Sequence, residues 1–101
     1  MKFKAVDFSR VPAFGEIVAR LVKIAPTFMP EKAGKDFDTD VYRIYVKRPS
    51  EDSIPIDLRA NLLTNIRDNP LGGESRYAKE LWMQLDGAIL GAFRRAETAR
   101  S

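Results

Sequence analysis

ESRYAKELWMQLDGAILGAFRRA, residues 74–96, is the stretch of this sequence that decides the fold. It contains no proline, it opens with an acidic residue, and it closes with the basic pair Arg94 and Arg95 followed by one alanine. This order of charge suits a helix, because the helix dipole favours negative charge near its start and positive charge near its end. We therefore expect a helix over residues 74–97, roughly 34 Å long at 1.5 Å per residue.

The apolar residues of this stretch predict that the helix is the spine of the core. At about 100° per residue, most of them fall in one arc of roughly 160°. The arc holds Tyr77, Ala78, Leu81, Trp82, Leu85, Ala88, Ile89, Ala92, Phe93 and Ala96. An arc this wide indicates a helix that packs against several other elements at once.

Two apolar residues and two glycines of the stretch lie outside that arc. Met83 and Leu90 stand seven residues apart on the opposite side, with Gly87 and Gly91 beside them. Glycine inside a helix costs about 1 kcal/mol relative to alanine, so two of them call for a reason. One interpretation is a solvated side with two tolerated glycines. The other is a second buried seam, formed against another part of the chain or against a second copy, which makes these four residues the candidate partner or oligomer interface.

A second helix is predicted over about residues 12–25. Its apolar positions are Phe14, Ile17, Val18, Leu21, Val22, Ile24 and Ala25, which share one face and are expected to pack against the spine. Pro26 disfavours helical geometry in the residue before it and so ends this helix. We expect residues 26–40 to form a loop, since Pro26, Pro30 and Gly34 interrupt them.

The best strand of the sequence covers residues 41–48, which are rich in β-branched and aromatic side chains and end before Pro49. Tyr42, Ile44 and Val46 alternate with Arg43, Tyr45 and Lys47, so one set faces the core and the other faces water. A lone strand cannot satisfy its own backbone hydrogen bonds. Its partner is expected to be the N-terminal arm, residues 2–8, the segment 28–40, or the same strand in a second copy.

A third helix is predicted over about residues 56–68, with Leu58, Leu62, Leu63 and Ile66 as its apolar face. Pro55 or Asp57 marks its start, because both residue types favour the first turn of a helix. The sequence thus predicts a single α+β domain, residues 1–101, that is mostly helical. Three helices pack on a short sheet that contains strand 41–48, with arm 2–8 as a further candidate strand, and residues 97–101 form a frayed tail.

Composition restricts the chemistry that this chain can perform. None of its 101 residues is histidine or cysteine, which excludes disulfides, zinc sites of the cysteine and histidine type, and catalytic triads that use histidine. No stretch approaches the ~18 consecutive apolar residues of a membrane helix, and no secretory leader is recognised. We expect a cytoplasmic protein that needs no cofactor and does not contact a membrane.

Alternating aspartates in the expected loop are the only metal-like pattern. Asp36, Asp38 and Asp40 repeat the spacing with which a calcium loop begins. The pattern then fails, because Val41 stands where glycine is required and Lys47 stands where a bidentate glutamate is required. A solvated acidic turn is therefore the leading interpretation, and a metal-dependent enzyme the least favoured one.

The outward face of strand 41–48 is a candidate nucleic-acid surface. Arg43 and Lys47 flank Tyr45, and Arg48 follows directly. Strand surfaces that hold single-stranded nucleic acid combine stacking aromatics with bases in this way, and Lys2 and Lys4 could extend the surface. The same residues also suit an ordinary outer strand face, on which charge prevents edge-to-edge aggregation. The net charge of +3 is compatible with either interpretation.

Two functional hypotheses follow from these patterns. The first is a non-enzymatic protein that binds another protein or forms a homodimer, because catalytic motifs are absent and apolar helix surface is in excess of what one small core needs. The second is a nucleic-acid-binding module that uses the basic strand face. The sequence favours the first.

Overall fold

The computed structural model describes residues 2–49, 53–69 and 76–100, and the side chains of all of these except residues 99 and 100. The elements follow one another as β1 (Lys4–Val6), a short 3-10 helix η1 (Phe8–Arg10), α1 (Phe14–Ile24), β2 (Met29–Asp36), β3 (Val41–Lys47), β4 (Ser53–Arg59), α2 (Ala60–Asp68) and α3 (Arg76–Arg100). The predicted α+β class is confirmed. The expectation of a mostly helical chain is weak, because helices take about half of the structure and strands more than a quarter.

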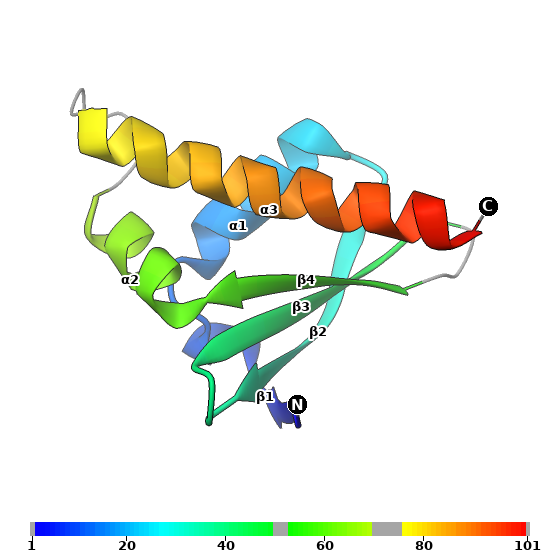
Figure 1. Cartoon of the computed structure of the whole chain (residues 1–101), viewed down its shortest axis with the longest axis horizontal. Coiled ribbons are helices and arrows are strands. Elements are labelled where there is room, and N and C mark those ends of the chain that lie inside the picture. The colour runs from blue at the N-terminus through cyan, green and yellow to red at the C-terminus, as the bar shows by residue number, and fades with distance from the viewer. Residues whose placement is uncertain (1, 50–52, 70–75, 101) are drawn as a thin grey trace.

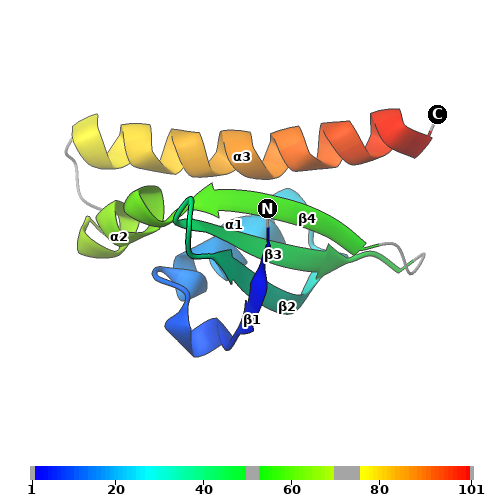
Figure 2. The ribbon, with the colours of Figure 1, turned by 60° about the horizontal axis from the view of Figure 1, so that its bottom comes forward.

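The four strands form one antiparallel sheet in the order β1-β2-β3-β4. The long helix α3 runs along β4, and α1 lies behind the sheet (Figures 1 and 2). The core lies between the helices and the inner face of the sheet. The opposite face of the sheet carries no helix among the described elements, so its side chains meet solvent.

The strand predicted at residues 41–48 is confirmed as β3. Tyr42, Ile44 and Val46 are buried, and they pair in register with Leu58, Ile56 and Ile54 of β4, which are buried too. The alternation of apolar and polar residues therefore predicted correctly which face of β3 joins the core. The N-terminal arm supplies β1, which pairs with β2 rather than with β3.

The helix predicted over residues 56–68 is wrong in its first four residues. Ser53–Arg59 is the strand β4, and helix α2 begins only at Ala60. In β4 every second residue is buried, the period that a half-buried strand requires. Pro55 had suggested a helix start. Here it lies in the last strand of the sheet, an edge position that tolerates a residue without a backbone N–H.

The loop predicted at residues 26–40 is also wrong, because Met29–Asp36 forms β2, an interior strand that pairs with both β1 and β3. Its sequence lacks the β-branched and aromatic residues of a typical strand. The pairing shifts register between Pro30 and Lys32, which accommodates the proline. The strand forms because its neighbours supply hydrogen bonds on both sides, and not because of its own propensity.

The two other predicted helices are confirmed as α1 and α3. Glu74 and Ser75, the first residues of the expected spine, lie outside the described residues, and α3 extends through residues 97–100 of the expected tail. Within the predicted arc of α3 six residues are buried: Ala78, Leu81, Trp82, Leu85, Ile89 and Ala92. Tyr77 of that arc and Val22 of α1 are exceptions, because each is about half exposed.

Candidate functional site

The outward side of α3 carries exposed apolar surface. Met83 is 70% exposed and Leu90 is 41% exposed. A Cβ atom built on Gly87 would meet nothing within 4 Å, and one built on Gly91 would meet only the flexible end of Arg95. The structure thus brings these four residues together, and we call Met83, Gly87, Leu90 and Gly91 the outer strip of α3.

No described element of the same chain covers the outer strip, so the interpretation of it as a seam against the described part of the chain is wrong. In Figure 2 the strands and the other helices all lie on one side of α3. The interpretation as a surface for a second copy, or for another protein, stays a prediction. A hollow of about 310 Å³ opens beside the strip and is lined by Glu80, Met83 and Gln84.

Charged side chains follow the outer strip toward both ends of α3. Arg76 and Glu80 lie before it, and Arg94 and Glu97 lie after it, all four exposed. Arg76 and Glu80 form an ion pair along the helix, with Nε and Oε1 3.7 Å apart. Exposed pairs of this kind contribute little to stability.

The open face of the sheet is a second candidate surface, and Arg43 is already engaged there. Its guanidinium donates two hydrogen bonds to the carboxylate of Asp57, at 2.6 Å and 3.0 Å. The same guanidinium lies 4.1 Å from the centre of the Phe3 ring. The hydrogen bonds to Asp57 raise the pKa of Arg43 further above its usual value. Because Asp57 balances its charge, Arg43 has less to offer a phosphate than the sequence suggested.

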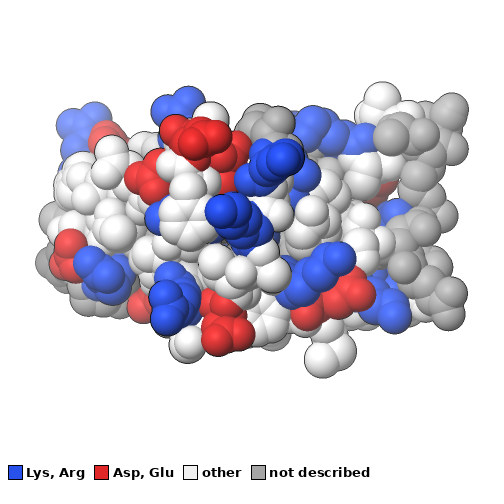
Figure 3. All heavy atoms as spheres, turned by 90° about the horizontal axis from the view of Figure 1, so that it is seen from below, with Lys and Arg blue, Asp and Glu red and all other residues white. Residues whose placement is uncertain are grey.

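The remaining residues predicted for nucleic-acid contact lie on or beside the same face. The Lys32 ammonium lies 4.8 Å from the centre of the Tyr45 ring, which covers one side of that aromatic group. Lys47 is exposed at the end of β3, and Arg48 is partly buried just beyond it. Figure 3 shows basic and acidic side chains interspersed over the described part of the face seen from below. The arrangement is a mixed surface and not a basic track.

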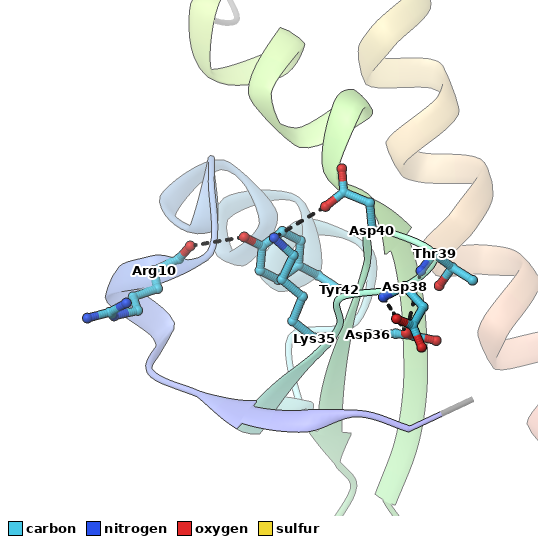
Figure 4. Close-up of polar contacts among 7 residues, drawn as sticks. All are labelled: Arg10, Lys35, Asp36, Asp38, Thr39, Asp40 and Tyr42. Atoms are coloured by element: carbon cyan, nitrogen blue, oxygen red, sulfur yellow. Dashed lines mark hydrogen bonds and ion pairs between the residues drawn. The ribbon is translucent and has the colours of Figure 1, made fainter.

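The three aspartates of the metal-like pattern do not converge (Figure 4). Asp36 is buried, and its Oδ1 accepts hydrogen bonds from the backbone N–H groups of Asp38, at 3.0 Å, and Thr39, at 3.4 Å. Burial would raise the pKa of Asp36, but these backbone hydrogen bonds outweigh it and the pKa is lowered. Asp40 forms a separate ion pair with Lys35 at 3.2 Å. Among the described residues no three or more acidic side chains lie close enough together to hold a metal ion.

A basic hollow that the sequence did not reveal lies beside this turn. Lys35 stands between the rings of Phe37 and Tyr42, at 4.8 Å and 5.0 Å from their centres, and its pairing with Asp40 raises its pKa. The Tyr42 hydroxyl donates to the carbonyl of Arg10 at 3.5 Å (Figure 4). Two adjoining hollows of about 420 and 330 Å³ share Val6, Arg10 and Phe37 in their linings. Sequence reasoning missed this site because it assigned residues 26–40 to a loop.

Comparisons of this chain with models of protein families, with curated proteins and with solved structures found no match. None of the helices in the described ranges has both the length and the apolar content needed to cross a membrane. The candidate sites therefore depend on geometry alone.

Proposed function

We propose that this chain is a non-enzymatic protein that works by binding another protein chain through the outer strip of α3, in an oligomeric assembly. The observation that supports the proposal is the exposure of Met83 and Leu90 beside the open space at Gly87. Apolar side chains gathered on one side of a helix, with charges around them, are typical of a protein-binding surface. The other side of α3 already forms the core, so binding of a partner at the outer strip does not compete with folding.

The ionisable groups support a non-enzymatic role. General acid–base catalysis favours groups whose pKa lies near the working pH. Among the described residues, four groups have pKa values that are shifted away from neutral pH: those of Arg20, Lys35 and Arg43 are raised, and that of Asp36 is lowered. These groups are held in their charged forms, which suits structural ion pairs and turns.

The test is a capture experiment with purified, tagged chain in a lysate of the source cells. Three baits are compared: the wild type, Met83→Lys, and Val22→Lys. Val22 is the matched control, because it is an exposed apolar helix residue on α1. The proposal expects a captured protein, identified by mass spectrometry and then tested in pure form, that is lost with Met83→Lys and kept with Val22→Lys. Identical captures with all three baits would overturn it.

A second candidate function is nucleic-acid binding. The observation that favours it is the presence of basic side chains in the hollows beside β1. Lys4 and Arg10 line the larger hollow together with Asp7, and Lys35, which is paired with Asp40, lines the other. Phe37 belongs to both linings and is 61% exposed. Binding of a fluorescent single-stranded oligonucleotide should then weaken steeply as salt is raised, because phosphate contacts release counterions. Absence of binding at low salt would remove this candidate, whether it uses these residues or Arg43, Tyr45, Lys47 and Arg48.

A further inference from the structure

The positions of the apolar and charged residues along the outer side of α3 indicate which chain covers the outer strip. We propose that it pairs with the same strip of a second copy of this chain, with the two α3 helices antiparallel and Gly87 of each copy at the two-fold axis. The inference rests on the proposed function, and it adds the partner, the orientation and the register.

The apolar residues are placed symmetrically about Gly87. Met83 lies four residues before it and Leu90 three residues after it. In an antiparallel pair centred on Gly87, Met83 of one copy therefore lies opposite the partner's Leu90, and the contact occurs twice. Both side chains are exposed in the single chain, so each can be buried only by another molecule.

The charges are symmetrical about the same glycine, with opposite signs. Glu80 lies seven residues before Gly87 and Arg94 seven residues after it. Arg76 lies eleven before it and Glu97 ten after it. At about 100° per residue, these four side chains and the apolar pair fall within an arc of roughly 100° on one side of the helix. In an antiparallel pair each acidic side chain thus faces a basic side chain of the partner.

A parallel pair would oppose like residues. Glu80 would face the partner's Glu80, and Arg94 would face the partner's Arg94, so each pair would repel. Like charges placed opposite one another at an interface discriminate against the wrong arrangement. The charge pattern therefore specifies the antiparallel orientation as well as the identity of the partner.

The glycine and the hollow fit this register. Gly87 has open space where a side chain would stand, so it allows two helix backbones to approach closely at the point where they cross. The hollow lined by Glu80, Met83 and Gln84 lies opposite the partner's Leu90 and Arg94. A two-fold arrangement uses the same surface on both copies, so it closes at two chains and leaves no free strip for a third.

The absence of native cysteine allows a direct test of the register. Purified full-length Gly87→Cys, Met83→Cys and Leu90→Cys chains are oxidised mildly, and disulfide-linked dimers are measured on non-reducing gels. Gly15→Cys is the matched control, because Gly15 is an exposed helical glycine of α1 with nothing within 4 Å of its Cβ position. A disulfide needs Cα atoms within about 7 Å of each other.

We expect Gly87→Cys to form linked dimers and Met83→Cys or Leu90→Cys alone to stay at the level of the Gly15→Cys control. In the proposed register the two copies of Met83 are about eight residues apart along the axis, roughly 12 Å. A mixture of Met83→Cys and Leu90→Cys should form the mixed dimer. Self-linkage of Met83→Cys and Leu90→Cys would indicate a parallel pair and overturn the register.

A charge swap provides a second, independent measurement. Arg94→Glu should weaken the dimer on the order of tenfold in light scattering, because two attractive pairs become repulsive. Adding Glu80→Arg to the same chain should restore it. A wild-type chain that is monomeric at tens of micromolar, with no linkage above the control, overturns the inference. If capture of a different protein is then still lost with Met83→Lys, the proposed function survives, and if it is not, both fail.

Discussion

Arg20 of α1 holds Asp86 of α3 with two hydrogen bonds, although 66 positions separate them in the sequence. The Arg20 Nε donates to Oδ1 at 2.8 Å, and the guanidinium also lies 5.6 Å from the centre of the Trp82 ring. The two side chains are 20% and 27% exposed, so solvent screens the pair only in part. The hydrogen bonds to Asp86 raise the pKa of Arg20, and the contact fixes α1 against the spine of the fold.

The coupling between Arg20 and Asp86 should be measurable in a double-mutant cycle. We expect Arg20→Met and Asp86→Asn to show a coupling of about 1 kcal/mol in the free energy of unfolding, because the contact is bidentate and partly buried. Urea unfolding followed by circular dichroism gives the value. Arg67 and Asp68 are the control, because that pair is more than half exposed and has one contact, of 3.3 Å. Equal couplings for both pairs would contradict the prediction.

Asp36 should make stability depend on acid pH. Its pKa is lowered from the ordinary value of 3.8, so the ionised form stabilises the fold above that value. This contribution is lost as the pH falls through the lower pKa of the folded state. Asp36→Asn keeps an oxygen acceptor for the turn but removes the charge. Melting temperatures at pH 7 and pH 3 should show the variant less stable than the wild type at pH 7, with a smaller difference at pH 3.

Gly34 should tolerate no side chain without displacement of β1. A Cβ atom there would stand 3.1 Å from the Phe3 Cβ and 3.3 Å from the Lys4 carbonyl oxygen. We expect Gly34→Ala to destabilise the fold by about 1–2 kcal/mol, because a backbone atom of the edge strand must move. Gly15→Ala, at an open helical position, should instead stabilise it by about 0.5–1 kcal/mol. Equal effects in denaturant unfolding would contradict the assigned contact.

Two leucines of the same helix should respond to truncation to very different extents. Leu85 is fully buried and Leu90 is 41% exposed. Leu85→Ala should lower the free energy of unfolding by about 2–5 kcal/mol, because it leaves a cavity in the core. Leu90→Ala should change it by less than about 0.5 kcal/mol at concentrations where the chain is a monomer. Thermal unfolding of both variants in parallel checks the orientation of α3.

Gly87→Ala should separate folding from association. In the monomer the substitution favours the helix by about 1 kcal/mol, since nothing within 4 Å opposes a Cβ atom. At the proposed two-fold axis two added methyl groups push the helices apart and weaken the dimer. Thermal unfolding in dilute solution and light scattering in concentrated solution should therefore change in opposite directions. A parallel rise of stability and dimer affinity would contradict the position of Gly87 at the crossing point.

The elements that the sequence predicted are those whose pattern is local. In α1, α3 and β3 the apolar period matches one regular structure along most of its length, and burial follows it. Ser53–Arg59 has an equally regular period of two, but Pro55 and the helical residues that follow outweighed it. Met29–Asp36 has no such pattern, because its place between two strands comes from the tertiary structure.

The candidate sites differ in how far the sequence predicted them. The outer strip of α3 follows directly from helical spacing, so Met83, Gly87, Leu90 and Gly91 were found together. The contacts of Arg43 with Asp57 and Phe3 were not predicted. Asp57 was assigned to a helix, and Phe3 is brought to Arg43 only by the assembled sheet. The basic hollow needs the pairing of β1 with β2, a contact across more than twenty residues that no local pattern encodes.

The strands stand side by side in the order in which the ribosome makes them. Strands β2, β3 and β4 can therefore form as consecutive hairpins, which need only short loops to close and so form rapidly. The inner face of this early sheet is apolar, and Leu81, Leu85 and Ile89 of α3 bury much of it. During synthesis the part of that face that α3 covers stays exposed to water until the helix has emerged, so completion of the core follows translation of α3. A chain stalled before residue 76 would therefore expose apolar strand residues to chaperones.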